Sequence, residues 1–174
     1  MDVHIRPLGH DEGELLDRVF AHLSPHSRYL RFHSPIGALS SPMRRALLAI
    51  DGHDHTALVA LSGGGEPVGI ARLIRDRRRP DEAEIAFEVV DGWQRRGVGR
   101  LLVTTLVDRA ERVGVKRVHA LVLPENTPAL TLLESVFPVC LARSGPDATE
   151  LVCLLPGDHG WEITTDDILA DLAA

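Results

Sequence analysis

The stretch Gln94-Arg95-Arg96-Gly97-Val98-Gly99 lies between a predicted strand, residues 82–90, and the clearest helix pattern of the chain. Its two glycines allow close backbone approach, and they fall where a helix start leaves four N–H groups without intrahelical partners. These donors and the positive end of the helix dipole attract anions. Arg95, Arg96 and Arg100 add positive charge at the same point. The stretch therefore predicts a site for a phosphate-bearing ligand.

Two common phosphate-binding motifs do not fit this stretch. A Walker loop requires G-x-x-x-x-G-K-[ST], and the sequence contains no such string. A dinucleotide-binding fingerprint requires G-x-G-x-x-G, but Leu102 occupies the position of the third glycine. A glycine-rich helix start that binds no ligand is the remaining alternative. The three arginines beside the glycines favour the ligand site.

The rest of the chain alternates between extended and helical patterns of apolar residues. Strands are predicted at residues 3–8, 56–61, 68–74, 82–90, 118–123, 139–143 and 149–155. Helices are predicted at residues 11–23, 41–50, 97–113 and 127–136. The pattern predicts one mixed α/β domain over residues 1–155, with a strand-rich middle and one strand–helix–strand unit. An acidic tail, residues 156–174, follows with a short helix expected at residues 166–173.

Composition narrows the class of protein. The 174 residues carry a net charge of −6, whereas general nucleic-acid binders cluster basic residues on one face. No apolar run approaches the length of about 18 residues that a membrane span needs, and the N-terminus lacks the pattern of a secretory signal. We therefore expect a cytoplasmic enzyme or binding module, with no nucleic-acid or membrane partner.

Cysteine and histidine residues suggest no special chemistry. Cys140 and Cys153 lie in apolar, strand-like runs, and we expect them to be buried free thiols. His53 and His55 form a metal-like cluster by composition, but they lack further ligands at suitable spacing. We expect these histidines to be solvated loop residues and predict no metal site.

The opening stretch also carries a family resemblance. It matches the Q/R-x-x-G-x-G/A signature of the GNAT superfamily of acetyltransferases, in the strand-to-helix context that this family requires. The order of elements over residues 3–155 is similar too: strand, two helices, three antiparallel strands, signature helix, strand, helix, two strands. Ser27-Arg28-Tyr29-Leu30-Arg31-Phe32 and Ala83-Glu84-Ile85-Ala86-Phe87 resemble the bacterial protein-lysine acetyltransferase branch.

The resemblance implies a GNAT-like fold, with a mostly antiparallel central sheet flanked by helices, and acetyl-CoA as co-substrate without a metal. It implies that the backbone of Val89 and Val90 pairs with the pantetheine arm, and that the signature amides hold the pyrophosphate. Asn126 either touches the cofactor, caps the next helix, or does both. The acceptor groove is expected along residues 28–42. The implied cofactor-binding residues are Val89, Val90, Gln94, Arg95, Arg96, Gly97, Val98, Gly99, Arg100 and Asn126.

Acetyl transfer to an amine needs a neutral nucleophile, whereas a lysine amine has a pKa of about 10.4 in water. A general base is therefore expected. Alternation along the strand places three glutamates on one face, Glu82, Glu84 and Glu88. Glu84 falls where many family members carry their base, with an ion pair to Arg72 as the alternative. Glu88 is the second catalytic candidate, with a cross-strand pair or an acceptor-orienting role as the alternative.

The sequence departs from the family at the proton donor. A tyrosine in the helix after Asn126 often protonates the leaving thiolate, but Leu133 stands there and the only tyrosine, Tyr29, is far away in sequence. The leading hypothesis is an N-acetyltransferase that moves an acetyl group from acetyl-CoA to a primary amine, with a protein lysine as one acceptor. The alternatives are a catalytically weak acyl-CoA-binding regulator and a small-molecule amine acetyltransferase. A homodimer is left open.

Overall fold

A computed structural model describes residues 2–145 and 147–155. The strands in this part of the chain are β1 (Val3–Pro7), β2 (His55–Ser62), β3 (Pro67–Arg75), β4 (Glu82–Val89), β5 (Arg117–Val122), β6 (Val139–Ser144) and β7 (Thr149–Leu154). The helices are α1 (Gly13–Ala21), α2 (Pro25–Phe32), α3 (Ser41–Leu47), α4 (Val98–Arg112) and α5 (Thr127–Val136), with a 3-10 turn, η1 (Asp91–Trp93), before α4. The helix predicted in the acidic tail lies outside the described residues.

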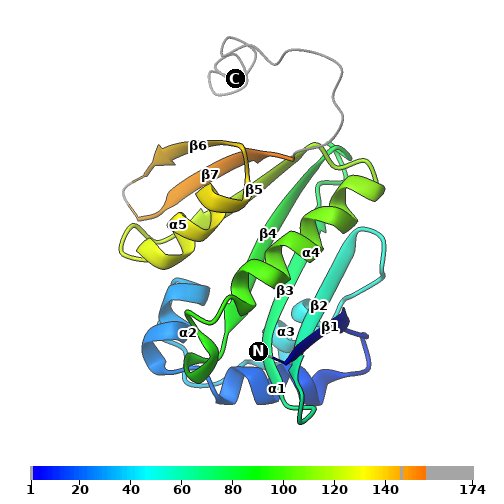
Figure 1. The fold of residues 1–174 in the computed structure, drawn as a ribbon, viewed down its shortest axis with the longest axis vertical. Helices are drawn as coiled ribbons and strands as arrows, with labels where there is room; N and C mark the ends of the chain where they lie inside the picture. The colour runs from blue at the N-terminus through cyan, green and yellow to red at the C-terminus, as the bar shows by residue number, and fades with distance from the viewer. Residues whose placement is uncertain (1, 146, 156–174) are drawn as a thin grey trace.

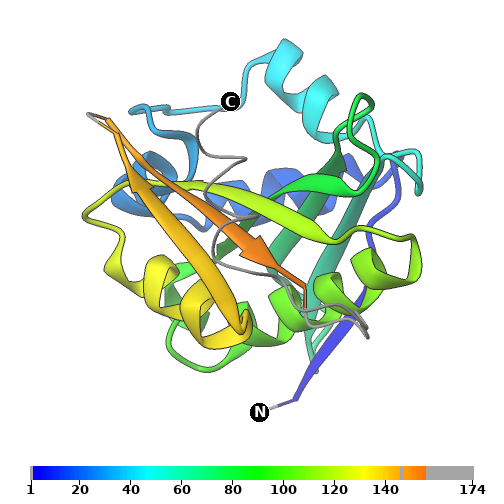
Figure 2. The ribbon, with the colours of Figure 1, turned by 90° about the horizontal axis from the view of Figure 1, so that it is seen from above.

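The strands form one sheet in the order β1-β2-β3-β4-β5-β7-β6. The β4–β5 pair is parallel, and every other neighbouring pair is antiparallel. Helices α1, α2 and α3 lie on one side of the sheet, and α4 and α5 lie on the other (Figure 2). The predicted mixed, mostly antiparallel sheet flanked by helices is therefore confirmed.

Three helices precede β2, so the prediction of two helices there is wrong. The missed helix is α2, which begins at Pro25. Ser24 is the N-cap, because its Oγ accepts a hydrogen bond from the Ser27 N–H at 3.1 Å, and Pro25 occupies the first turn. Proline suits that position because its missing N–H would have no intrahelical partner there. The start of α3 has a similar pattern, with Ser40 as the N-cap and Pro42 in the first turn.

The parallel strands β4 and β5 stay together over a short distance only. Their register joins Glu82–Glu84 to Arg117–His119, and beyond it the strands diverge toward the end where α2 lies (Figure 1). β5 continues in register with β7 through Val122, while β4 continues with β3. Among the described residues, one edge of β4 beyond Glu84 is therefore without a neighbouring strand.

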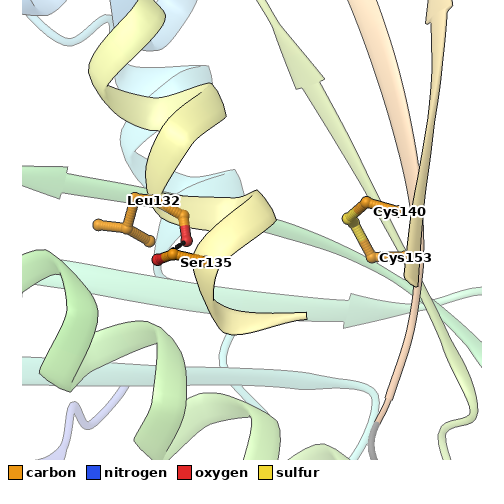
Figure 3. The surroundings of a disulfide bond; sticks show 4 residues. All are labelled: Leu132, Ser135, Cys140 and Cys153. Carbon is orange, nitrogen blue, oxygen red and sulfur yellow. Dashed lines mark hydrogen bonds between the residues drawn. A yellow bond between two sulfur atoms is a disulfide. The ribbon is translucent and has the colours of Figure 1, made fainter. Parts of the chain in front are cut away.

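Cys140 and Cys153 are joined by a disulfide, so the prediction of free thiols is wrong (Figure 3). They are direct cross-strand partners on β6 and β7, with their Cα atoms 4.1 Å apart. Non-hydrogen-bonded pairs in antiparallel sheets bring side chains this close. The register between the two strands creates the pair, and the sequence alone does not reveal that register.

We expected His55 to be a solvated loop residue, and this prediction is wrong. It begins β2 opposite Ile74, and the pairing leaves it 7% exposed. Burial lowers the pKa of His55 below its ordinary value, and the positive charge of Arg72 adds to the decrease. His53 does lie exposed, with its Nδ1 2.7 Å from Asp54 Oδ1.

The disulfide can be tested by thiol labelling. We expect iodoacetamide to modify neither cysteine in the folded, unreduced protein and both after reduction and unfolding. A disulfide across a separation of 13 residues restricts the unfolded chain, which corresponds to a stabilisation of about 3 kcal/mol. Denaturant unfolding with and without reductant measures this difference, and a Cys140→Ala variant that shows no reductant effect is the control. Labelling of both thiols without reductant would contradict the bond.

Candidate functional site

The backbone of the signature stretch curls before α4. Arg95 and Gly97 both have left-handed backbone conformations, with φ angles of 56° and 83°. Such a curl turns successive N–H groups toward one point and forms a concave site for an anion. Gly97 is the N-cap of α4 and has no side chain to accept hydrogen bonds, and the first turn contains no acidic residue. The donors of the helix start therefore remain for a ligand, which fits a phosphate group.

Gly99 is required for a different reason. A Cβ atom at this position would lie 3.0 Å from Leu132 Cδ1 and 3.7 Å from Val89 Cγ2. Its absence lets α4 pack closely against both α5 and β4. The first glycine of the signature thus shapes the anion site, and the second positions the helix that carries it.

The side chain of Gln94 braces the turn between β4 and α4. Its Nε2 donates to Val89 O at 3.0 Å, Asp91 Oδ1 at 3.1 Å and Ser27 Oγ at 3.2 Å. Asp91 also accepts from Ser27 Oγ at 2.6 Å and from the Ser24 N–H at 3.1 Å. Burial opposes ionisation of Asp91, but the hydrogen bonds outweigh it, so its pKa lies below the ordinary value. Gln94 therefore supports the turn through its side chain, a role that the motif match did not reveal.

The two valines after Glu88 differ in what their backbone offers. The Val90 N–H donates to Val68 O at 3.0 Å, and its carbonyl accepts from the Trp93 N–H at 2.8 Å. Backbone groups alternate in direction along a strand, so the Val89 N–H points away from β3, toward the edge of β4 that has no neighbouring strand. Of the two predicted pantetheine-pairing residues, the geometry therefore favours Val89.

The three arginines of the stretch are held in different ways. The Arg96 guanidinium lies over the Trp93 ring, 5.1 Å from its centroid, and Arg95 is exposed on the turn. Arg100 Nη1 donates to Ser135 Oγ on α5 at 2.9 Å, and that hydroxyl in turn donates to Leu132 O at 2.7 Å (Figure 3). The Arg100 side chain is thus directed to α5, and the contact predicted for this residue rests on its backbone amide.

A cavity of about 250 Å³ lies on the face of the sheet that is opposite to α4. Helices α2 and α3 form its walls and β3 and β4 its floor. Glu84 is exposed within it, and its carboxylate makes no ion pair or hydrogen bond with any other described residue. The side chains that line it are Arg31, Phe32, Met43, Ala46, Leu47, Arg72, Ile74, Glu84 and Ala86. The predicted acceptor region, residues 28–42, contributes Arg31 and Phe32.

Glu88, in contrast, is neutralised by two arginines. It is 7% exposed, its Oε2 accepts from Arg31 Nε at 2.6 Å, and its Oε1 lies 3.5 Å from Arg72 Nη2. The ion pair considered for Glu84 with Arg72 is therefore made by Glu88. This is the cross-strand pair that was the alternative to a catalytic role for Glu88.

Comparison with known proteins identifies the family. Residues 19–137 match the model of the Acetyltransferase (GNAT) family, which is more than half of the chain. The chain belongs to the GNAT family. It is 35% identical over 104 residues to Acetyltransferase Pat of Mycolicibacterium smegmatis, covering 59% of this chain and 31% of that protein. It is 31% identical over 121 residues to Acetyltransferase PA5475 of Pseudomonas aeruginosa, covering 68% of this chain and 64% of that protein.

A solved GNAT domain has the same fold. The GNAT domain of S. lividans PAT superposes with a TM-score of 0.80 at 28% identity, over 88% of this chain and 90% of that one. The chain spans less than two thirds of the length of the two curated relatives. In the described residues, none of the helices has the length and apolar character required to cross a membrane.

Two further residues, Asn126 and Tyr29, lie near the start of α5. Asn126 caps α5, because its Oδ1 accepts from the Ala129 N–H at 3.3 Å, which confirms the predicted N-cap. The Tyr29 hydroxyl, on α2, donates to Glu125 Oε1 at 3.3 Å. The Glu125 charge and this hydrogen bond raise the pKa of Tyr29. Leu133 is fully buried in the core, whereas the contact with Glu125 brings Tyr29, from a distant part of the sequence, next to the start of α5.

Replacing Gly97 tests the anion site. Gly97→Ala forces a side chain into the left-handed conformation, which costs about 1–2 kcal/mol, and it disturbs the converging N–H groups. We expect a lower free energy of unfolding and weaker binding of acetyl-CoA, measured by denaturant unfolding and calorimetry. Gly92→Ala is the matched control, because nothing lies within 4 Å of a Cβ there and its φ angle is not positive. Equal effects of the two substitutions on acetyl-CoA affinity would contradict the assignment.

Proposed function

We propose that this protein is an N-acetyltransferase that uses acetyl-CoA to acetylate a primary amine, with Glu84 as the general base. The observation that carries the proposal is the contrast between Glu84 and Glu88 on β4. Glu84 faces a cavity without a partner, while Glu88 is buried and paired with Arg31 and Arg72. A carboxylate that can accept a proton and meet an acceptor is therefore present at one of these two positions only.

The residues of the signature fit the co-substrate that GNAT proteins use. The converging amides from Arg95 to the first turn of α4 would hold the pyrophosphate, and the Val89 N–H would pair with the pantetheine arm. When bound, acetyl-CoA supplies the thioester whose carbonyl carbon the amine attacks. Asn126 lies at the start of α5, beside the end of β5, and would contact the same arm.

The chain's own part in the reaction is to remove a proton. As the amine nitrogen bonds to the acyl carbon and the carbon–sulfur bond breaks, the nitrogen must lose one proton. An oxygen of Glu84 accepts it, and coenzyme A leaves as a thiolate that takes a proton from solvent, so the products are an amide and coenzyme A. The exposure of Glu84 in the cavity allows the proton to pass on to solvent between turnovers. Direct attack of this kind needs no covalent intermediate on the protein.

Two classes of acceptor fit this proposal. Protein lysine is the acceptor suggested by the resemblance of residues 27–32 and 83–87. The apolar lining of the cavity, which includes Phe32, Leu47 and Ile74, suits its methylene stem. A small-molecule amine would fill the same cavity of about 250 Å³. A regulator that binds acyl-CoA without turnover is the competing function, and it would leave the partnerless Glu84 without a purpose.

A Glu84→Gln variant tests the base. Loss of a general base lowers rates by about 100-fold or more, so we expect a fall of that size in kcat with acetyl-CoA affinity unchanged. The rate of the variant should rise toward alkaline pH, where solvent deprotonates the amine. The measurement is release of coenzyme A thiol against pH with a panel of amines and lysine peptides.

Glu134→Gln on the exposed surface of α5 is the matched control and should behave like the parent. A Glu84→Gln variant with the parent's rate at every pH would remove Glu84 as the base. If the parent protein binds acetyl-CoA but none of the acceptors causes thiol release, the protein is the regulator instead.

A further inference from the structure

Arg72 is the most deeply buried charged side chain described in the structure. It is 2% exposed, and its Nη1 donates to Leu47 O at 2.8 Å. Its Nε and Nη2 have no hydrogen-bond partner within residues 2–145 and 147–155, although Nη2 lies 3.5 Å from a Glu88 oxygen. A guanidinium carries five N–H donors, and leaving buried donors unsatisfied is costly. These two nitrogens are closed off from solvent, so Arg72 contributes its positive charge to the wall of the cavity.

Arg31 adds a second, more accessible guanidinium to the same wall. Its side chain is 17% exposed, and Nε is bonded to Glu88 while its guanidinium carbon lies 4.9 Å from the centre of the Phe32 ring. Neither of its terminal nitrogens makes a hydrogen bond with another described residue. Two arginines thus share one carboxylate, which leaves this end of the cavity with excess positive charge.

Glu84 provides the opposite charge at the other end. In the sheet register Arg72 faces Ala86 and Ile74 faces Glu84, so Arg72 and Glu84 are diagonal neighbours on one face. Diagonal neighbours lie about 7–8 Å apart. The small side chain of Ala86 leaves the floor between them open. The cavity therefore has a positive end and a negative end with an open floor in between.

We propose that the acceptor is a compact amine that also carries a carboxylate or similar anionic group, as a free amino acid does. The anionic group binds the terminal N–H groups of Arg31, the positive charge of Arg72 behind them strengthens the attraction, and this places the amine beside Glu84. Arginine recognises carboxylates through paired, charge-assisted hydrogen bonds. The inference rests on the proposed acetyltransferase function and chooses the small-molecule class of acceptor over a lysine in a protein.

Matched acceptor pairs test the inference in the unmodified protein. The pairs are glycine with glycinamide and β-alanine with β-alaninamide, together with a lysine peptide that has neutral neighbours. We expect kcat/KM to be about tenfold or more higher for each acid, because charge-assisted hydrogen bonds are lost with the amide. The amide's amine is the less basic of each pair, so its larger neutral fraction works against the expected result.

The outcomes separate this inference from the proposed function. Equal or faster acetylation of the amides, or a preference for the lysine peptide, overturns the inference and leaves the acetyltransferase function intact. If none of the amines releases thiol while acetyl-CoA binds, both are overturned.

Variants then locate the anion-binding end. Arg31→Gln and Arg72→Gln should each raise KM for the acids by about tenfold, so that the ratio of acid to amide kcat/KM falls toward one. Arg45→Gln is the matched control. Arg45 is exposed on α3 and lies outside the cavity, and its substitution changes the net charge by the same amount. Arg31 is partly exposed, so its variant keeps the test decisive if the Arg72 variant does not fold. An unchanged ratio in Arg31→Gln would overturn the proposal.

Discussion

The buried carboxylate of Glu82 joins β4 to β5 at the end where these two strands are paired. It is 4% exposed, and its oxygens lie 3.1 Å from His119 Nε2, 3.2 Å from Arg79 Nη1 and 3.5 Å from Arg117 Nη2. A buried carboxylate is tolerated only when it is paired and hydrogen-bonded. Because Arg117 and His119 lie on β5, satisfying Glu82 requires the strands to meet here. Their divergence beyond Glu84 exposes the edge of β4 on which the proposed site depends.

The other end, where β4 and β5 diverge, is held by the polar contacts of α2. No residue of this helix is buried, so apolar packing does little to hold it. Its Ser27 binds Asp91 after β4, its Arg31 binds Glu88 on β4, and its Tyr29 binds Glu125 after β5. α2 therefore bridges the diverging strands through hydrogen bonds and ion pairs. Segments with few buried apolar contacts open at low free-energy cost, which suits a helix beside a site that ligands must enter.

The sequence was sufficient for the signals that are local. The Asn126 cap and the glycine-rich start of α4 each depend on a few adjacent residues. The sheet with its flanking helices followed from periodicity and from the family signature. α2 was missed although Ser24-Pro25 is a local start signal, because its apolar residues do not form a buried stripe.

Features that depend on register could not be read from the sequence. Glu84 and Glu88 lie on the same strand face, so the sequence pattern does not distinguish them. They differ because Arg72 on β3 and Arg31 on α2 pair with Glu88. The same holds for the Cys140–Cys153 disulfide, which follows from the pairing of β6 with β7. Tyr29 reaches Glu125 across a separation of 96 residues, and no local pattern indicates such a contact.

The pairing of Glu88 also explains how Glu84 can remain without a partner beside two arginines. Arg72 has diagonal neighbours at both Glu84 and Glu88, and a buried guanidinium is stabilised most by the carboxylate that is itself removed from water. Glu88 is 7% exposed and has Arg31 as a second partner, so the ion pair forms there. Glu84, facing the cavity, gains less from pairing because water screens its charge. The burial of one glutamate thus leaves the other available for an amine.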